Sequence, residues 1–238
     1  SLAASFRTVE GYDLVAGANR GRERLEEFGD RHDVSGLYTD YREMLDAEDP
    51  DVVAVCTQSP EKCDAVLACA DAGVDAVIVE KAFATSLAEA DEMIAACEDA
   101  GTRIAVDHPM RFSPMYRRLK ELAGDGTIGD LTHVTSHSAG LVHGGSHDFD
   151  VLRFLGGDVS SVYARIPELD PGAVEGDPLE GTYEDLDGDV MLTFESGAVG
   201  HVECTADTHR GVVVRGTEGY VTAPRGLGGV MNLVESRS

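Results

Sequence analysis

Short apolar runs alternate with amphipathic stretches over the first half of the chain. The runs DVVAVCT at 51–57 and VIV at 77–79 are typical of strands buried on both faces of a parallel sheet. Between them, a helix is expected to begin at Ser59–Pro60 and to end at Gly73. Its apolar positions follow the i, i+3, i+4, i+7 rule and are Cys63, Val66, Leu67 and Ala70.

The same alternation extends to both sides of this pair of strands. Capping boxes at Asp40–Glu43 and Ser86–Glu89 predict the starts of two further helices. A helix is also expected at 2–6, and a charged helix is expected to end by Gly29. Further strands are expected at 12–18, 34–38 and 103–106. Strands that alternate with helices through short connections predict a doubly wound, Rossmann-type parallel sheet.

The pattern changes after Asp107. Helices are expected from Ser113–Pro114 to Gly124 and from Ser146 to Gly156, with a strand at 131–138 between them. A long loop is expected at 167–187, and Glu195–Ser196–Gly197 predicts a hairpin. Strand-like runs follow at 159–166, 189–195, 198–205, 212–215 and 220–223. We therefore expect two domains: a doubly wound, Rossmann-like domain at 1–110, and an α+β domain with a mostly antiparallel open sheet at 111–238.

The charge is strongly negative, with 44 acidic and 19 basic residues among 238 and a net charge of -25. Such a surface repels nucleic acid and anionic membranes, so both are excluded as partners. No apolar run is long enough for a membrane span. Abundant acid with only three lysines (Lys62, Lys81 and Lys120) is typical of a halophile-like, solvated surface. It also makes Lys81, in its apolar context, a stronger candidate for chemistry.

The five cysteines are odd in number and form no CxxC pair. Two of them, Cys63 and Cys69, lie on an apolar helical pattern. We expect buried free thiols in a reducing cytoplasm, and no zinc site built from them.

Two residues carry the candidate chemistry. Lys81 follows the VIV strand, and the carboxyl ends of strands in open parallel sheets are where ligands bind. His147, in GGSHDFD, lies at the start of a predicted helix, where the macrodipole disfavours imidazolium. A neutral imidazole can accept a hydroxyl proton. Asp150, one turn further on, could orient the imidazole ring or cap the helix.

Several ordered motifs resemble the Gfo/Idh/MocA oxidoreductases, the group of glucose-fructose oxidoreductase and inositol dehydrogenase. The resemblance covers nearly the whole chain. The motifs are TDYREML at 39–45, Thr57 at its turn, AGVDAVIVEK at 72–81, RFSP at 111–114, TIGDL at 127–131, GSHDFD at 145–150 and GTEGY at 216–220.

The resemblance implies a hydride transfer between a nicotinamide dinucleotide and a hydroxyl or keto group of a sugar, cyclitol or polyol, between the two domains. Lys81 matches the family's Glu-Lys-Pro lysine and would stabilise developing alkoxide charge. His147 matches the catalytic histidine. Thr57, Glu80 and Lys81 would contact the cofactor. The family also implies a homo-dimer or homo-tetramer formed through the open sheet.

The chain departs from the family pattern at three places. His143 stands where an aspartate is usual; it could relay a proton but supplies no fixed negative charge. Ala82 replaces the proline after Lys81, which removes a φ restraint. The first strand and its GxGxxG turn are not found before Leu2. We therefore expect a sheet that lacks its first strand and weak dinucleotide binding by residues 1–238.

Cofactor choice is indicated at the end of the second strand of the family fold. NAD-specific folds usually carry an acidic residue there, whereas this chain has Asn19 and Arg20, which suit a 2'-phosphate. NADP is therefore favoured over NAD.

Two alternatives stay open. His133, His137, His143 and His147 could form a zinc hydrolase site, although no HExxH spacing is present, and we assign no metal-binding residue. The chain could also be a sugar-sensing or assembly subunit that keeps the fold without turnover.

Overall fold

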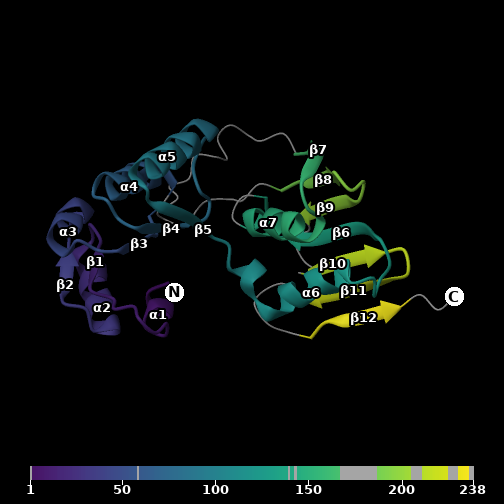
Figure 1. Cartoon of the computed structure of the whole chain (residues 1–238), viewed down its shortest axis with the longest axis horizontal. Helices are drawn as coiled ribbons and strands as arrows, with labels where there is room; N and C mark the ends of the chain where they lie inside the picture. Colours follow the sequence, from purple (N-terminus) through teal and green to yellow (C-terminus); the bar gives the residue numbers. More distant parts are fainter. Residues whose placement is uncertain are drawn as a thin grey trace. The chain divides into compact units, whose positions relative to one another are not determined.

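The structure is a computed structural model that describes residues 2–57, 59–138, 140–141, 144–166, 187–204, 211–224 and 230–235. The chain divides into two compact units, residues 1–107 and 108–238, which are coloured from purple to blue and from teal to yellow in Figure 1. Within the described residues, no helix is both long and apolar enough to cross a membrane.

The first unit is built from alternating helices and parallel strands, as predicted. Strands β1 and β2 pair with each other, and strands β3, β4 and β5 pair in that order, all in parallel. The helices are α1 (Leu2–Phe6), α2 (Arg22–His32), α3 (Tyr41–Glu48), α4 (Ser59–Asp71) and α5 (Leu87–Ala100). The strands are β1 (Ala16–Ala18), β2 (Gly36–Tyr38), β3 (Val52–Val55), β4 (Ala76–Glu80) and β5 (Arg103–Asp107). The strands β1 and β2 are shorter than the sequence predicted.

Helix caps follow the predicted residues, with one difference. Ser86 accepts from the backbone N–H of Glu89 at 3.2 Å, and the Glu89 carboxylate accepts in turn from the N–H of Thr85 at 2.9 Å. The Thr85 hydroxyl also donates to this carboxylate, at 2.5 Å, and the hydrogen bonds from Thr85 lower the pKa of Glu89, the hydroxyl bond most. Asp40 caps α3 by accepting from the N–H of Arg42 at 2.8 Å. The reciprocal contact from Glu43 expected of a capping box is not formed.

The core of the first unit lies where α4 and α5, side by side in Figure 1, cover the central strand β4. Alternate β4 residues, Val77 and Val79, are fully buried. Cys69 of α4 is buried with them, and burial raises the pKa of its thiol to about 12, as expected for an inert core cysteine. All five cysteines are free, Cys56 and Cys63 being less buried than Cys69.

The second unit packs two helices against one face of a seven-stranded sheet. The strand order is β12-β11-β10-β6-β9-β8-β7; β6 and β9 are parallel, and the other neighbours are antiparallel. This confirms the α+β prediction. The elements are η1 (Pro109–Phe112), α6 (Pro114–Gly124), β6 (Leu131–Ser138), α7 (Gly145–Gly156), β7 (Val159–Arg165), β8 (Asp189–Phe194), β9 (Val199–Cys204), β10 (Gly211–Gly216), β11 (Gly219–Pro224) and β12 (Asn232–Glu235).

Local signals position most of these elements. Ser113 caps α6 by accepting from the N–H of Tyr116, with Pro114 at the first helical position. Gly197, at φ +85, makes the predicted hairpin between β8 and β9. Strand β12 was not predicted, and the loop expected at 167–187 lies outside the described residues up to position 186.

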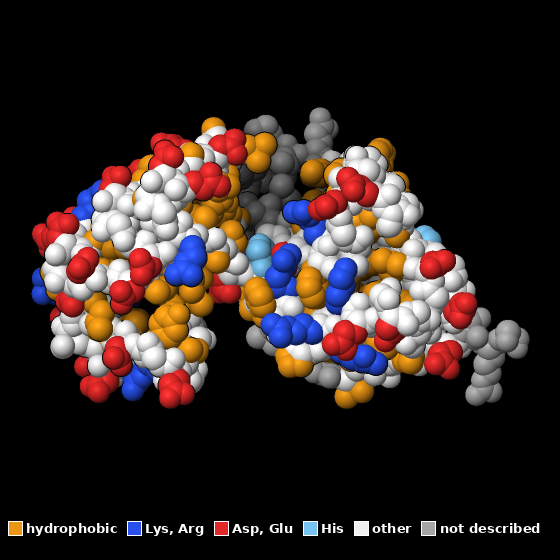
Figure 2. Space-filling view, in the orientation of Figure 1, with side chains coloured by type: hydrophobic (Ala, Val, Ile, Leu, Met, Phe, Trp, Pro, Cys, Tyr) orange, Lys and Arg blue, Asp and Glu red, His pale blue; other side chains and the backbone are white. Residues whose placement is uncertain are grey.

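Acidic side chains cover both units on the face shown in Figure 2, as the composition predicts. Basic side chains on this face gather over the region of α6, whose sequence includes Arg117, Arg118 and Lys120.

Candidate functional site

The carboxyl ends of β3, β4 and β5 form one edge of the parallel sheet in the first unit. Thr57 follows β3, Glu80 and Lys81 lie at the end of β4, and Asp107 ends β5. Parallel strands bring these residues to one edge because the strands run in register in the same direction. The structure therefore brings together three of the predicted cofactor residues: Thr57, Glu80 and Lys81.

Thr57 carries the clearest indication of a ligand at this edge. Its hydroxyl oxygen is buried and has no hydrogen-bond partner among the described groups. Buried hydroxyls are nearly always paired, so an unsatisfied one at a strand end fits a site that a ligand completes. The residues at this edge thus fit a bound dinucleotide.

Lys81 is partly exposed, and its neighbour in the chain is held by another lysine. The side chain of Lys62, on α4, donates from Nζ to the carbonyl oxygen of Ala82 at 2.6 Å. The peptide between Lys81 and Ala82 is cis. Lys62 is 2% exposed, whereas the sequence reasoning noted it only as one of three lysines. A buried lysine one turn into an amphipathic helix could have been recognised from its place beside the apolar stripe.

The turn after β1 carries the two residues predicted to select the cofactor. Asn19 accepts from the N–H of Gly21 at 2.8 Å, which closes the turn before α2. The guanidinium of Arg20 pairs with the carboxylate of Glu61 on α4. Arg20 is therefore already engaged by an acid, which the sequence did not indicate.

His147 lies in the first turn of α7, as predicted, in contact with a second histidine. The rings of His108 and His147 meet edge to face, with centroids 5.5 Å apart. Nδ1 of His108 is buried and has no hydrogen-bond partner among the described groups. Sequence reasoning missed His108, although its position directly after the last parallel strand was a usable signal.

The residue after His147 fixes α7 to the sheet. Asp148 is fully buried, and its Oδ1 accepts from the hydroxyl of Ser136 on β6 at 2.6 Å. A carboxyl group in a core needs such donors because it has left water. This hydrogen bond sets the position of the helix turn that carries His147.

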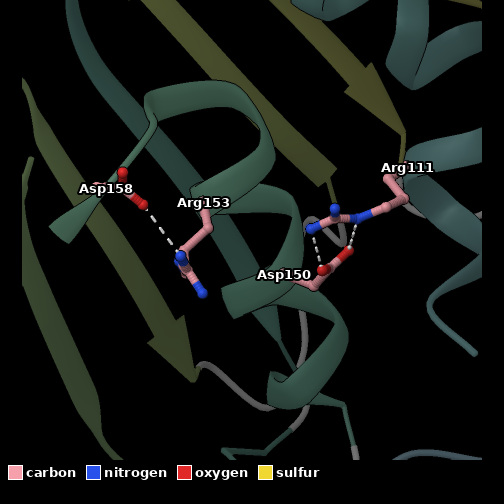
Figure 3. Close-up of polar contacts among 4 residues, drawn as sticks. All are labelled: Arg111, Asp150, Arg153 and Asp158. Carbon is pink, nitrogen blue, oxygen red and sulfur yellow. Dashed lines mark hydrogen bonds and ion pairs between the residues drawn. The ribbon is translucent and has the colours of Figure 1, made fainter. Parts of the chain in front are cut away.

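Asp150 performs neither role expected of it. Figure 3 shows its carboxylate facing Arg111 in a two-pronged ion pair, with Nε donating to Oδ2 at 3.0 Å and a terminal guanidinium nitrogen donating to Oδ1. The carboxylate therefore neither orients His147 nor caps α7. The same figure shows Arg153 pointing to Asp158, at 3.1 Å. The first pair connects α7 to η1, and the second connects α7 to the residues that directly follow it.

The histidines of the zinc alternative lie on different elements. His133 and His137 are on β6, where Nε2 of His137 lies 3.4 Å from Glu203, and His147 is on α7. His143 lies outside the described residues. Over the part of the chain that the structure describes, no three histidine, cysteine or acidic side chains are grouped as metal ligands.

Among the described residues of the second unit, two hollows can be named. One, of about 360 Å³, is bordered by the end of α6, the start of β6 and the loop between them, and by Thr217 and Glu218. The other, of about 480 Å³, lies between β6 and β10, against His133 and Arg215. Neither is lined by His108 or His147.

Family comparisons account for both units. Residues 2–108 match the model described as "Oxidoreductase family, NAD-binding Rossmann fold", and residues 138–222 match the "GFO/IDH/MocA C-terminal domain". The chain therefore belongs to the GFO/IDH/MocA family of oxidoreductases, and the resemblance of the motifs is confirmed.

Two of the relatives that this chain resembles are named as dehydrogenases. The chain is 32% identical over 219 residues to D-apiose dehydrogenase of Paraburkholderia graminis. This alignment covers 84% of this chain and 56% of the relative. It is 29% identical over 218 residues to myo-inositol 2-dehydrogenase of Thermotoga maritima. This alignment covers 84% of this chain and 63% of the relative. The chain thus spans less than two thirds of either relative.

Solved structures agree on the fold. A probable dehydrogenase of Thermotoga maritima superposes with a TM-score of 0.76 at 27% identity, over 94% of this chain and 71% of that one. An oxidoreductase of Agrobacterium radiobacter, solved with NAD+, L-tartaric acid and magnesium, superposes with a TM-score of 0.81 at 21% identity. The match covers 99% of this chain and 75% of that one.

Proposed function

We propose that the protein is an NAD(P)-dependent oxidoreductase that transfers a hydride between the nicotinamide and a CH–OH or keto group of a sugar, cyclitol or related polyol. The observation that carries the proposal is the position of Lys81 at the carboxyl end of β4, the central strand of its sheet, in the unit that matches the NAD-binding family model. The named relatives supply the substrate class.

Each candidate residue has a separate role in this proposal. The ammonium of Lys81 stabilises negative charge that develops on the reacting oxygen. The imidazole of His147 accepts the hydroxyl proton, and its place in the first turn of α7 favours the neutral form that can do so. The bound nicotinamide supplies the hydride acceptor. His143 is proposed to relay the proton onward.

His108 joins this set because its ring touches that of His147. The edge-to-face contact restricts the orientation of the imidazole, so His147 presents one ring edge consistently. We infer that His108 limits the rotation of the general base.

The dinucleotide is proposed to bind along the edge formed by Thr57, Glu80 and Lys81, with Asn19 and Arg20 beside the ribose. NADP is favoured over NAD, because the guanidinium of Arg20 can exchange its carboxylate partner Glu61 for a 2'-phosphate. Replacement of Glu61 by Gln should then strengthen NADPH binding relative to NADH. Equal effects on both cofactors would contradict the assignment.

We also propose a homo-oligomer formed through the sheet face opposite α6 and α7. Tyr163 and Met191 pair across β7 and β8 on that face and are 68% and 47% exposed. Apolar side chains left exposed on a sheet are typical of an interface. Sedimentation of the double variant Tyr163→Glu, Met191→Glu should show smaller particles than the parent.

A cytoplasmic location is proposed as well. All five cysteines are free thiols, which suits a reducing compartment.

The test of the proposed function is a turnover assay over sugars, cyclitols and polyols with both cofactors, followed by nicotinamide absorbance. Lys81→Met and His147→Asn should each lower kcat by about a hundredfold or more, whereas Lys120→Met, a change in the other unit at a residue with no proposed role, should not. Cofactor binding without turnover on any substrate would favour the sugar-sensing or assembly subunit instead.

A further inference from the structure

The side chain of Lys62 is buried, which is unusual because its ammonium group loses contact with water. It lies on α4 and is 2% exposed, although lysines are almost never fully buried without a partner. It is among the largest side chains that the first unit buries completely. Burial of an ammonium costs free energy, so a side chain kept there has a structural or functional reason.

The partner of Lys62 is backbone, and that backbone belongs to the turn that carries Lys81. Nζ donates to the carbonyl oxygen of Ala82 at 2.6 Å, a short, charge-assisted hydrogen bond. Ala82 directly follows Lys81. The bond therefore joins α4 to the segment that follows β4, at the residue next to Lys81.

The buried ammonium of Lys62 has charged groups around it at the end of β4. The pKa of Lys62 is lowered, first by burial and also by the positive charge of Lys81, while the carboxylate of Glu80 and the thiol of Cys56 oppose the shift. Two cations are thus kept within electrostatic reach of each other at the end of β4. The Glu80 carboxylate offsets the repulsion between them, so burial remains the main cause of the lowered pKa of Lys62.

We propose that Lys62 is a positioning residue: its side chain anchors the Ala82 carbonyl and so fixes the direction in which Lys81 leaves the sheet. This inference rests on the proposed role of Lys81. It assigns Lys62 no contact with substrate. The anchor takes the place of a φ restraint, because the residue after Lys81 is alanine and its φ is free.

The experiment uses the full chain with three variants. Lys62→Met removes the donor and keeps an unbranched side chain, and Lys62→Arg keeps a donor. Lys120→Met is the matched control, since Lys120 also donates to a backbone carbonyl, that of Leu155 at 3.1 Å, in the other unit. Amide hydrogen exchange is followed over residues 80–86, and kcat and KM are measured with the best polyol substrate.

Exchange over 80–86 should be about 10- to 100-fold faster in Lys62→Met, which is the range expected for loss of one charge-assisted hydrogen bond. Lys62→Arg should restore protection, and Lys120→Met should not alter it. In the assay, Lys62→Met should lower kcat much more than it changes KM. In a Lys81→Met background it should have little further effect, because a positioning residue acts through the residue it positions.

Unchanged exchange in Lys62→Met would overturn the proposal, and so would an equal loss of kcat with and without Lys81. If Lys62→Met does not fold, Lys62→Gln, whose shorter side chain cannot reach the carbonyl, decides the matter by the same readouts. If the parent chain turns over no substrate, the proposed function fails, whereas the exchange measurement still decides whether Lys62 anchors the segment.

Discussion

The hydrogen bond between Ser136 and Asp148 allows the sharpest prediction about the second unit. Both residues are fully buried, and the bond is 2.6 Å long. Replacing Ser136 by Ala removes the donor and leaves the carboxyl group in the core. A hydrogen bond of this kind contributes about 1 to 3 kcal/mol, so the free energy of unfolding should fall by that amount.

The measurement is equilibrium urea unfolding of the parent and the variant. The control is Thr135→Ala, which alters the neighbouring β6 residue on the opposite, less buried face and should change the free energy of unfolding by under about 0.5 kcal/mol. Because Asp148 follows His147, the Ser136 variant should also expose the first turn of α7 to faster amide exchange. A Ser136 variant as stable as the Thr135 control would refute the reasoning.

Three further predictions concern other parts of the chain. The unfolded chain binds the Lys62 proton more tightly, because the folded pKa of Lys62 lies below 10.5. The parent should therefore gain stability relative to Lys62→Met as the pH rises from the lowered folded pKa toward 10.5, as compared by urea unfolding, and a flat difference would contradict this. Ser86→Ala removes the N-cap of α5 and should cost about 1 kcal/mol in the same assay, whereas Ser86→Asp should not. Gly156→Ala would place a Cβ 2.4 Å from the ring of the buried Phe194 and should cost about 1 to 3 kcal/mol by thermal unfolding, relieved by Phe194→Leu.

The local pattern of the sequence was sufficient for most elements. The bounds of β6, and the starts of α5 and α6 at Ser86 and Ser113, were predicted from alternation and capping residues alone. These signals are local because an amphipathic face and a cap depend on residues a few positions apart. Lys81 and His147 were predicted as site residues because Lys81 directly follows a strand and His147 lies in the first turn of a helix.

The partners of the polar side chains were decided only by the tertiary structure. Asp150 pairs with Arg111, 39 residues away, and the anchor on Ala82 comes from Lys62, 20 residues away. No periodicity encodes such pairs, because they arise when separate elements pack together and buried charges must find donors. The strand β12 was missed for a related reason: an edge strand with every residue exposed carries no burial pattern to recognise. The sequence by itself determined the order of the helices and strands and the family. Packing decided which polar side chains form hydrogen bonds and ion pairs with one another.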